Sequence, residues 1–212
     1  MNRRSPVLCL CLIIAGLAAL HVEPATAQTS SSSQDVQLYV GEMFGDRLME
    51  TPLSGDTPRL NDYVTFGGRY TYNFMKQLGI QLSAGYTPTR AAHLPSGDSD
   101  LGLTTVDLDA VWYVLPDYSL AGHKFCAYAE TGVGYAWAHL NHDLFGFAAH
   151  RPVTIADSNG YTANAGLGAK YDLFDKFFVD FDVRYRYLSK LTSAYGRGIN
   201  TVQTTLSLGY QF

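Results

Sequence analysis

The most regular feature of the chain is an alternation of apolar and polar residues, which recurs in eight segments of about ten residues. The segments are Val36–Phe44, Tyr63–Tyr72, Leu78–Thr87, Leu103–Val114, Phe125–Trp137, Tyr161–Tyr171, Phe177–Leu188 and Asn200–Phe212. The connections 73–77 and 172–176 are short and 115–124 is intermediate, whereas 45–62, 88–102, 138–160 and 189–199 are longer and more polar. Short turns on one side and long loops on the other are typical of barrels that span a membrane. The pattern predicts an all-β fold, an eight-stranded antiparallel up-and-down transmembrane β-barrel.

The polar face decides which way the strands are oriented. A lipocalin-type soluble barrel also has eight alternating strands, but its apolar face points inward. A water-facing surface is about 25–35% charged and rich in lysine, whereas the eight polar faces here contain one lysine, Lys170. In the last segment Gln203, Thr205 and Ser207 are small or amide residues. We therefore expect the polar faces to point into the lumen and the apolar faces to contact lipid.

The few charged residues on the polar faces are nearly balanced in sign. They are Arg69, Asp107, Asp109, Glu130, Lys170, Asp180, Asp182, Arg184 and Arg186. Unpaired buried charges are very unfavourable, so these four cations and five anions should form ion pairs. Glycines on the same faces leave room for long side chains, such as Tyr39 and Tyr128, to cross the lumen. Because an eight-stranded lumen is just wide enough for side chains to fill, we expect these ion pairs to plug it.

Composition supports a membrane environment. Charged residues make up 16% of the chain and aromatic residues 13%, whereas soluble domains are about 25% charged. The aromatic residues gather at the segment ends on the apolar face, among them Tyr72, Trp112, Trp137 and Tyr187. Tyrosine and tryptophan prefer the boundary between membrane and water. The aromatic residues at the two ends of the segments therefore predict two girdles, one at each membrane surface.

The N-terminus has the pattern of a secretory signal. Residues 1–27 combine Arg3 and Arg4, the apolar run Val7–Leu20 and the small residues Ala25–Ala27, which predict cleavage after Ala27. We interpret 28–34 as a flexible leader and 35–212 as the barrel domain. One cysteine, Cys126, follows the predicted cleavage site, so no internal disulfide is expected, and we interpret it as a small space-filling residue. No basic run suggests a nucleic-acid partner.

The C-terminus resembles the signal by which the outer-membrane assembly machinery recognises its clients. Its terminal aromatic residue follows alternating apolar positions: Leu206, Leu208, Tyr210 and Phe212. Together with "AETGVGYAW" and "VRYRYL", this makes residues 35–212 similar to small outer-membrane barrels of the OmpA-transmembrane, OmpX and OmpW type. The resemblance implies a monomer in the outer membrane of a Gram-negative cell. The implied partners are outer-membrane lipids, lipopolysaccharide, the assembly machinery and periplasmic chaperones.

Three functions are compatible with such a barrel. The first is a structural or surface-interaction role with a plugged lumen, and the second is a narrow channel for small solutes, including hydrophobic ones. The third is a lipid-modifying enzyme, which needs a serine with a histidine base. Ser189 is present, but Tyr187 occupies the position where the PagL type of deacylase has its histidine. We therefore expect no enzyme activity, no catalytic residue and no cofactor.

The long segment 138–160 contains three histidines. His139, His142 and His150, with Asp143, are residue types that bind zinc or copper. No helix is predicted there to fix their spacing. We expect a polar external loop and no metal site.

Overall fold

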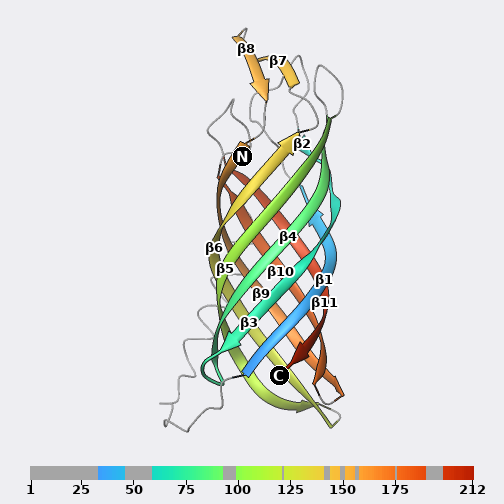
Figure 1. The fold of residues 1–212 in the computed structure, drawn as a ribbon, viewed down its shortest axis with the longest axis vertical. Helices are drawn as coiled ribbons and strands as arrows, with labels where there is room; N and C mark the ends of the chain where they lie inside the picture. Colours follow the sequence, from blue (N-terminus) through green and yellow to red (C-terminus); the bar gives the residue numbers. More distant parts are fainter. Residues whose placement is uncertain are drawn as a thin grey trace, which may run out of the picture. The chain divides into compact units, whose positions relative to one another are not determined.

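In the computed structural model, the described residues lie almost entirely in β-strands (Figure 1). It describes residues 33–45, 59–92, 99–120, 122–140, 144–148, 151–155, 158–174, 176–189 and 198–212. The eight long strands are β1 (Ser33–Phe44), β3 (Tyr63–Asn73), β4 (Leu78–Ala92), β5 (Ser99–Leu120), β6 (His123–Leu140), β9 (Ser158–Phe174), β10 (Phe177–Leu188) and β11 (Ile199–Gln211). The short strands are β2 (Arg59–Leu60), β7 (Leu144–Ala148) and β8 (Arg151–Ile155). In the part of the chain that is described, no helix has the length and apolar character needed to span a membrane.

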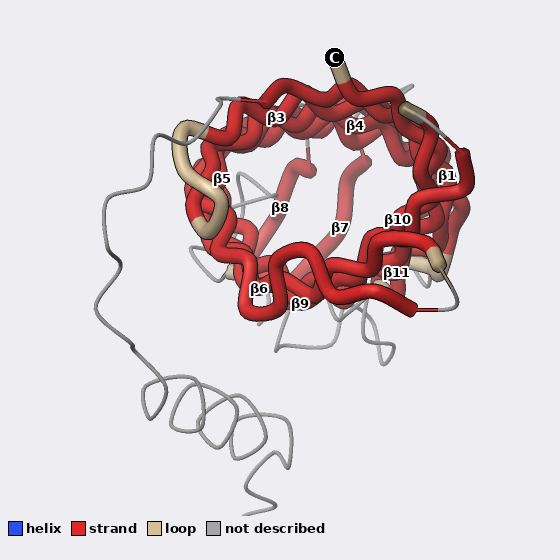
Figure 2. Tube along the Cα trace, turned by 90° about the horizontal axis from the view of Figure 1, so that it is seen from below, coloured by secondary structure: helices blue, strands red, loops and turns tan. Residues whose placement is uncertain are grey.

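The long strands form a closed antiparallel ring, visible end-on in Figure 2. Strand β1 pairs with both β3 and β11, and β4 pairs with β5, so none of the eight is left as a free edge. Following the paired residues once around the ring from Gln34 leads back to Phe44 of the same strand, because the strands tilt against the barrel axis. The predicted eight-stranded antiparallel barrel is confirmed.

The two ends of the barrel differ. At one end, the turn end, β3–β4, β5–β6 and β9–β10 are joined by short turns, and Gln34 exchanges backbone hydrogen bonds with Phe212 (3.3 and 2.9 Å). At the other end, the loop end, the connections are longer. There β2 pairs with the end of β4, and β7 and β8 form a separate hairpin within the connection from β6 to β9.

Side chains alternate across the barrel wall as predicted. On β11, Leu206 and Leu208 are 58% and 56% exposed on the outside, whereas Thr205 and Ser207 are almost completely buried inside. The same alternation on the other barrel strands gives a mostly apolar exterior and an interior that is polar except at the loop end. A lipocalin-type barrel has the reverse arrangement, so that alternative is excluded.

Several strand boundaries differ from the sequence expectation, because strands β4, β5, β6 and β9 extend into the predicted connections next to them. The predicted connection 115–124 is mostly strand, because β5 continues to Leu120 and only a tight turn with Gly122 at φ 85° separates it from β6. Bulges near Leu115 shift the register and accommodate Pro116, which a regular central ladder would not. Strand β1 begins at Ser33, so Ser33 and Gln34, placed in the leader from sequence, pair with β3 instead. The remainder of the predicted leader and the predicted signal segment lie outside the described residues.

Candidate functional site

The lumen contains all nine charged residues that the sequence pattern assigned to it. Arg69, Asp107, Asp109, Glu130, Lys170, Asp180, Asp182, Arg184 and Arg186 are each at most 8% exposed. A tenth charged residue, Asp35 of β1, is buried with them. The alternation with Gln37 and Tyr39 could have identified it, but the expected strand began one residue later. Asp35 changes the predicted balance of four cations and five anions to four and six among the described residues.

Glycines make space for the large side chains that cross the lumen. The Tyr39 hydroxyl lies over Gly67 and Gly85, and the Tyr128 ring lies over Gly168. In each case a β-carbon on the glycine would overlap the aromatic side chain. These glycines therefore allow the wide rings to fit inside a narrow barrel.

Lys170 occupies the turn end of the lumen. Its Nζ donates hydrogen bonds to Asp35 Oδ2 (3.0 Å) and to the Tyr113 hydroxyl (3.2 Å). The rings of Tyr113, Tyr128 and Phe178 lie 4.9–5.9 Å from the same nitrogen, within the range of cation–π attraction. We call Lys170, Asp35 and these three rings the turn-end cluster. It ties β1 to the opposite wall of the barrel through a buried ion pair.

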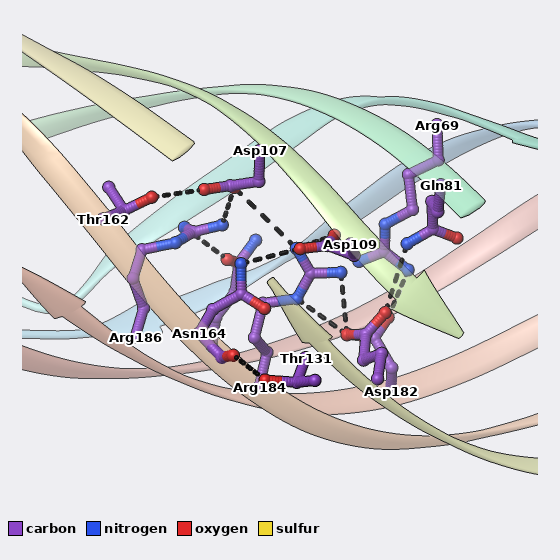
Figure 3. Close-up of polar contacts among 12 residues, drawn as sticks. Arg69, Gln81, Asp107, Asp109, Thr131, Thr162, Asn164, Asp182, Arg184 and Arg186 are labelled. Carbon is purple, nitrogen blue, oxygen red and sulfur yellow. Dashed lines mark hydrogen bonds and ion pairs between the residues drawn. The ribbon is translucent and has the colours of Figure 1, made fainter. Parts of the chain in front are cut away.

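Between this cluster and the loop end, arginines bridge strands across the lumen (Figure 3). Arg69 Nη1 of β3 lies 2.6 Å from Asp182 Oδ2 of β10, which also accepts a hydrogen bond from the Thr205 hydroxyl. Arg184 Nη2 lies 2.7 Å from Glu130 Oε1, and its Nη1 lies 3.2 Å from Asp109 Oδ2. Every charged group here is almost completely buried, so each depends on its partner for stability.

The arginine network continues toward the loop end. Arg186 Nη2 lies 2.5 Å from Asp107 Oδ2, and Arg186 Nη1 donates to Gln203 Oε1 at 2.9 Å. The other oxygen of Asp107 accepts a hydrogen bond from the Thr162 hydroxyl at 2.6 Å. Neutral side chains thus donate hydrogen bonds to some of the carboxylates, which outnumber the cations among the described lumen residues. Asp180 is another example, since it accepts a hydrogen bond from the Tyr128 hydroxyl (2.9 Å).

Apolar residues replace the charges at the loop end of the interior. The large buried apolar residues there, which we call the apolar tier, are Met43, Leu60, Leu101, Leu103, Leu188 and Ile199. They are at most 3% exposed. Sequence reasoning missed this tier because it expected every inward position to be polar. The signal was present in "LGL" at 101–103, where alternation continues upstream of the predicted strand.

Among the described residues, the other candidates do not come together in a second site. The Ser189 hydroxyl accepts a hydrogen bond from the Tyr161 backbone N–H at 2.9 Å, and the Ser189 N–H donates to the Tyr161 carbonyl. His139 lies in β6, but His142 and His150 lie outside the described residues. No cluster of metal-ligating side chains occurs in the described ranges. Cys126 is half-buried against Val111, Tyr113 and Tyr128, which fits its interpretation as a space-filling residue.

The C-terminal residues form an outward aromatic and aliphatic row. Leu206, Leu208 and Phe212 are exposed, and the Tyr210 ring contacts Phe177 edge-on at 5.1 Å and lies 6.3 Å from Phe212. Lys176 Nζ lies 5.7 Å from the centre of the Tyr210 ring. This geometry presents the four predicted assembly-signal residues on one outer strip. Their recognition during assembly stays a prediction.

Comparison with known proteins gives one family. A family model described as "Outer membrane protein beta-barrel domain" matches residues 12–212. Neisserial surface protein A aligns with a TM-score of 0.56 at 12% identity, over 86% of this chain and 100% of that one. The outer membrane protein OprG from Pseudomonas aeruginosa aligns with a TM-score of 0.53 at 17% identity, over 84% and 95%. No curated protein sequence gives a significant match. At these identities the structural matches show the fold alone.

Proposed function

Because the chain belongs to the outer membrane protein beta-barrel domain family, we propose that it is a non-conducting barrel with a structural or surface-interaction role. The protein is an outer-membrane transmembrane β-barrel of the Gram-negative type. In the proposed role the barrel wall anchors the chain in lipid, the long loops contact the exterior, and the lumen serves stability rather than transport.

The layered filling of the lumen carries this proposal. The turn-end cluster occupies one end, the arginine network the middle and the apolar tier the other end. An ion would have to displace Arg69 and Arg184 from carboxylates within 2.6–2.7 Å and then pass buried leucines. Moving a charge past apolar groups, or separating buried ion pairs, requires several kcal/mol at each step. These features favour a closed tube.

The proposed orientation places the turn end in the periplasm and the loop end outside the cell. Residues 1–27 direct export and are removed in this proposal. Phe212 and the alternate residues before it engage the assembly machinery, after periplasmic chaperones have held the unfolded chain. Outer-membrane lipid and lipopolysaccharide surround the finished monomer. The exposed apolar exterior supports the lipid contact.

Planar bilayer recording tests the proposal. The purified full chain should insert without discrete conductance steps. The double variant Arg69→Ala/Arg184→Ala removes the two guanidinium groups from the middle of the lumen and should produce measurable openings. Arg90→Ala is the matched control, because Arg90 pairs with Asp100 on the surface, where the two side chains are 45% and 61% exposed. Steady conductance by the wild-type protein would contradict the proposal.

A narrow channel for small neutral solutes is the second candidate. One observation favours it: Thr201 Oγ1, Ser207 Oγ and Gln37 Oε1 are buried polar atoms without a hydrogen-bond partner in the described lumen. Buried polar groups usually bind ordered water when they lack a protein partner. A file of water beside the arginines would let small polar solutes pass. Swelling of proteoliposomes in glycerol, faster than that of empty vesicles, would support this function over the first.

We also propose that the chain is not an enzyme. An activated serine donates its hydroxyl to a histidine base, but Tyr187 occupies the position of that histidine, and the contact of the Ser189 hydroxyl in the structure is the hydrogen bond it accepts from the Tyr161 backbone N–H. Mass spectrometry of lipid A and phospholipids after overexpression should show the same profile for the wild-type chain and for Ser189→Ala. A changed lipid profile that Ser189→Ala abolishes would refute this proposal.

A further inference from the structure

Two outward-facing tyrosines near the loop end hold asparagine side chains of the neighbouring strand. The Tyr135 hydroxyl of β6 donates to Asn159 Oδ1 of β9 at 2.8 Å, and the Tyr185 hydroxyl of β10 donates to Asn200 Oδ1 of β11 at 2.6 Å. Because each amide oxygen accepts the tyrosine, the amide nitrogen with its two N–H groups is the remaining donor of that side chain. The same arrangement therefore occurs at two places on the circumference of the barrel.

Exposed aromatic rings surround the first of these pairs. Trp137 contacts Tyr135 edge-on, with ring centres 4.8 Å apart. Tyr161 lies opposite Tyr135 in the β6–β9 register and is 70% exposed. An aromatic girdle needs only a boundary between membrane and water. Flat rings beside a directed N–H donor are also suited to binding a sugar, because a sugar packs its C–H face on an aromatic ring while its oxygens accept hydrogen bonds.

We infer that the Tyr135–Asn159 and Tyr185–Asn200 pairs bind the headgroup of a phosphorylated glycolipid of the outer leaflet, that is, lipopolysaccharide. The amide N–H groups donate to phosphate or sugar oxygens, and Trp137 and Tyr161 pack against a sugar ring. The inference rests on the proposed orientation, in which the loop end faces outward. In that orientation both asparagines lie at the outer leaflet, because Asn159 and Asn200 are each the second residue of a strand that begins at the loop end.

Lipid is the occupant that the position favours. The four aromatic residues lie on the apolar exterior of a closed barrel, whose backbone edges are all paired. A protein partner would have to displace the surrounding membrane to reach them. Phosphates and sugars concentrate at the depth where the apolar exterior ends, and they supply the acceptor oxygens that fixed amide donors match.

The turn end contains a third pair that serves as the matched control. There the Tyr70 hydroxyl donates to Gln34 Oε1 at 2.7 Å, on the outer face of β3 and β1. The chemistry is the same, but in the proposed orientation this pair faces the inner leaflet, which holds phospholipid. A change at Gln34 should therefore leave any response to lipopolysaccharide intact.

The experiment measures the midpoint of thermal unfolding, read from heat-modifiable migration in gels, for the full chain in phosphatidylcholine nanodiscs. Lipopolysaccharide is added to one series and phosphatidylglycerol to another. Lipopolysaccharide should raise the wild-type midpoint more than phosphatidylglycerol does. Asn159→Leu/Asn200→Leu should lose at least half of that extra shift, whereas Gln34→Leu should keep it. Tyr135→Phe/Tyr185→Phe keeps the rings, frees the amides and should also reduce the shift, which covers the case of a misfolded asparagine variant.

Two outcomes would overturn the inference. Equal midpoint shifts with both lipids would show that the rings form an unspecific girdle. An undiminished response in both the asparagine and the tyrosine double variants would show that the pairs do not bind the headgroup. A response lost only in Gln34→Leu would instead show that the turn end faces outward, and so refute the orientation on which both proposals rest.

Discussion

Replacing Arg184 with glutamine should destabilise the barrel by about 3–5 kcal/mol, the usual effect of removing one partner from a buried ion pair. The three carboxylates within reach of Arg184 are Glu130 at 2.7 Å, Asp109 at 3.2 Å and Asp107 at 3.8 Å. Asp107 keeps Arg186 as a partner, and Asp109 keeps the amide of Asn164 at 2.8 Å. In the described part of the chain, the hydrogen bond that Glu130 keeps is the one from the neutral amide of Gln81 at 3.1 Å. The loss should therefore correspond to one stranded carboxylate rather than three.

The assay is equilibrium unfolding by urea in phospholipid vesicles, followed by tryptophan emission. The chain contains two tryptophans, Trp112 and Trp137, both in barrel strands, so emission reports the barrel. Arg90→Gln is the matched control, because exposed ion pairs contribute about 0–1 kcal/mol. The reasoning is refuted if Arg184→Gln changes the free energy of unfolding no more than Arg90→Gln does.

A second variant separates the stranded charge from the lost packing. Glu130→Gln removes the carboxylate that Arg184→Gln leaves unpaired. The double variant Glu130→Gln/Arg184→Gln should therefore be more stable than Arg184→Gln alone, by about 1–3 kcal/mol. Additive effects of the two substitutions in urea unfolding would contradict a direct ion pair.

Three further predictions concern single positions. Gly85→Ala should lower the free energy of unfolding by about 1–3 kcal/mol, because the new β-carbon would overlap the Tyr39 hydroxyl. Adding Tyr39→Phe should restore most of the loss in the same urea assay, and failure of this rescue would contradict the contact. Glu42 is exposed on the outer face, between Val64 and Thr204 of the neighbouring strands, and its charge should destabilise the barrel in lipid. Glu42→Leu should therefore raise the free energy of unfolding in vesicles by about 1 kcal/mol. An unchanged or lower value would count against lipid contact at this position. Phe212→Ala should reduce the amount of protein recovered in outer membranes several-fold while leaving refolding in detergent unchanged; equal recovery would argue against its role as an assembly signal.

The barrel was predictable because its constraint repeats at every second residue. In "TTLSLGYQF" one register places Leu206 and Leu208 outside and Ser207 inside, and a shift of one residue would reverse all of them. The charged lumen residues were predictable for the same reason. Whether a residue points inward depends only on its odd or even position in the alternating strand, and this can be read from the sequence.

Pairing across the lumen could not be predicted. Arg69 and Asp182 are 113 positions apart, and their contact depends on barrel tilt and register, which no local pattern specifies. Strand ends were missed where local signals disagree with pairing, as at Pro116, where bulges let β5 continue. The apolar tier was missed because alternation distinguishes inside from outside but does not say that the interior must stay polar along the whole axis.

Quenching by lipid tests the central claim most directly, namely that the apolar face contacts acyl chains and the polar face encloses the lumen. Single-tryptophan variants can be made in a Trp112→Phe/Trp137→Phe background, with Leu206→Trp on the outside and Phe178→Trp inside the turn-end cluster. In vesicles of lipid brominated on its acyl chains, emission from position 206 should be strongly quenched and emission from position 178 should be nearly unaffected. Strong quenching at 178 together with protection at 206 would contradict the account.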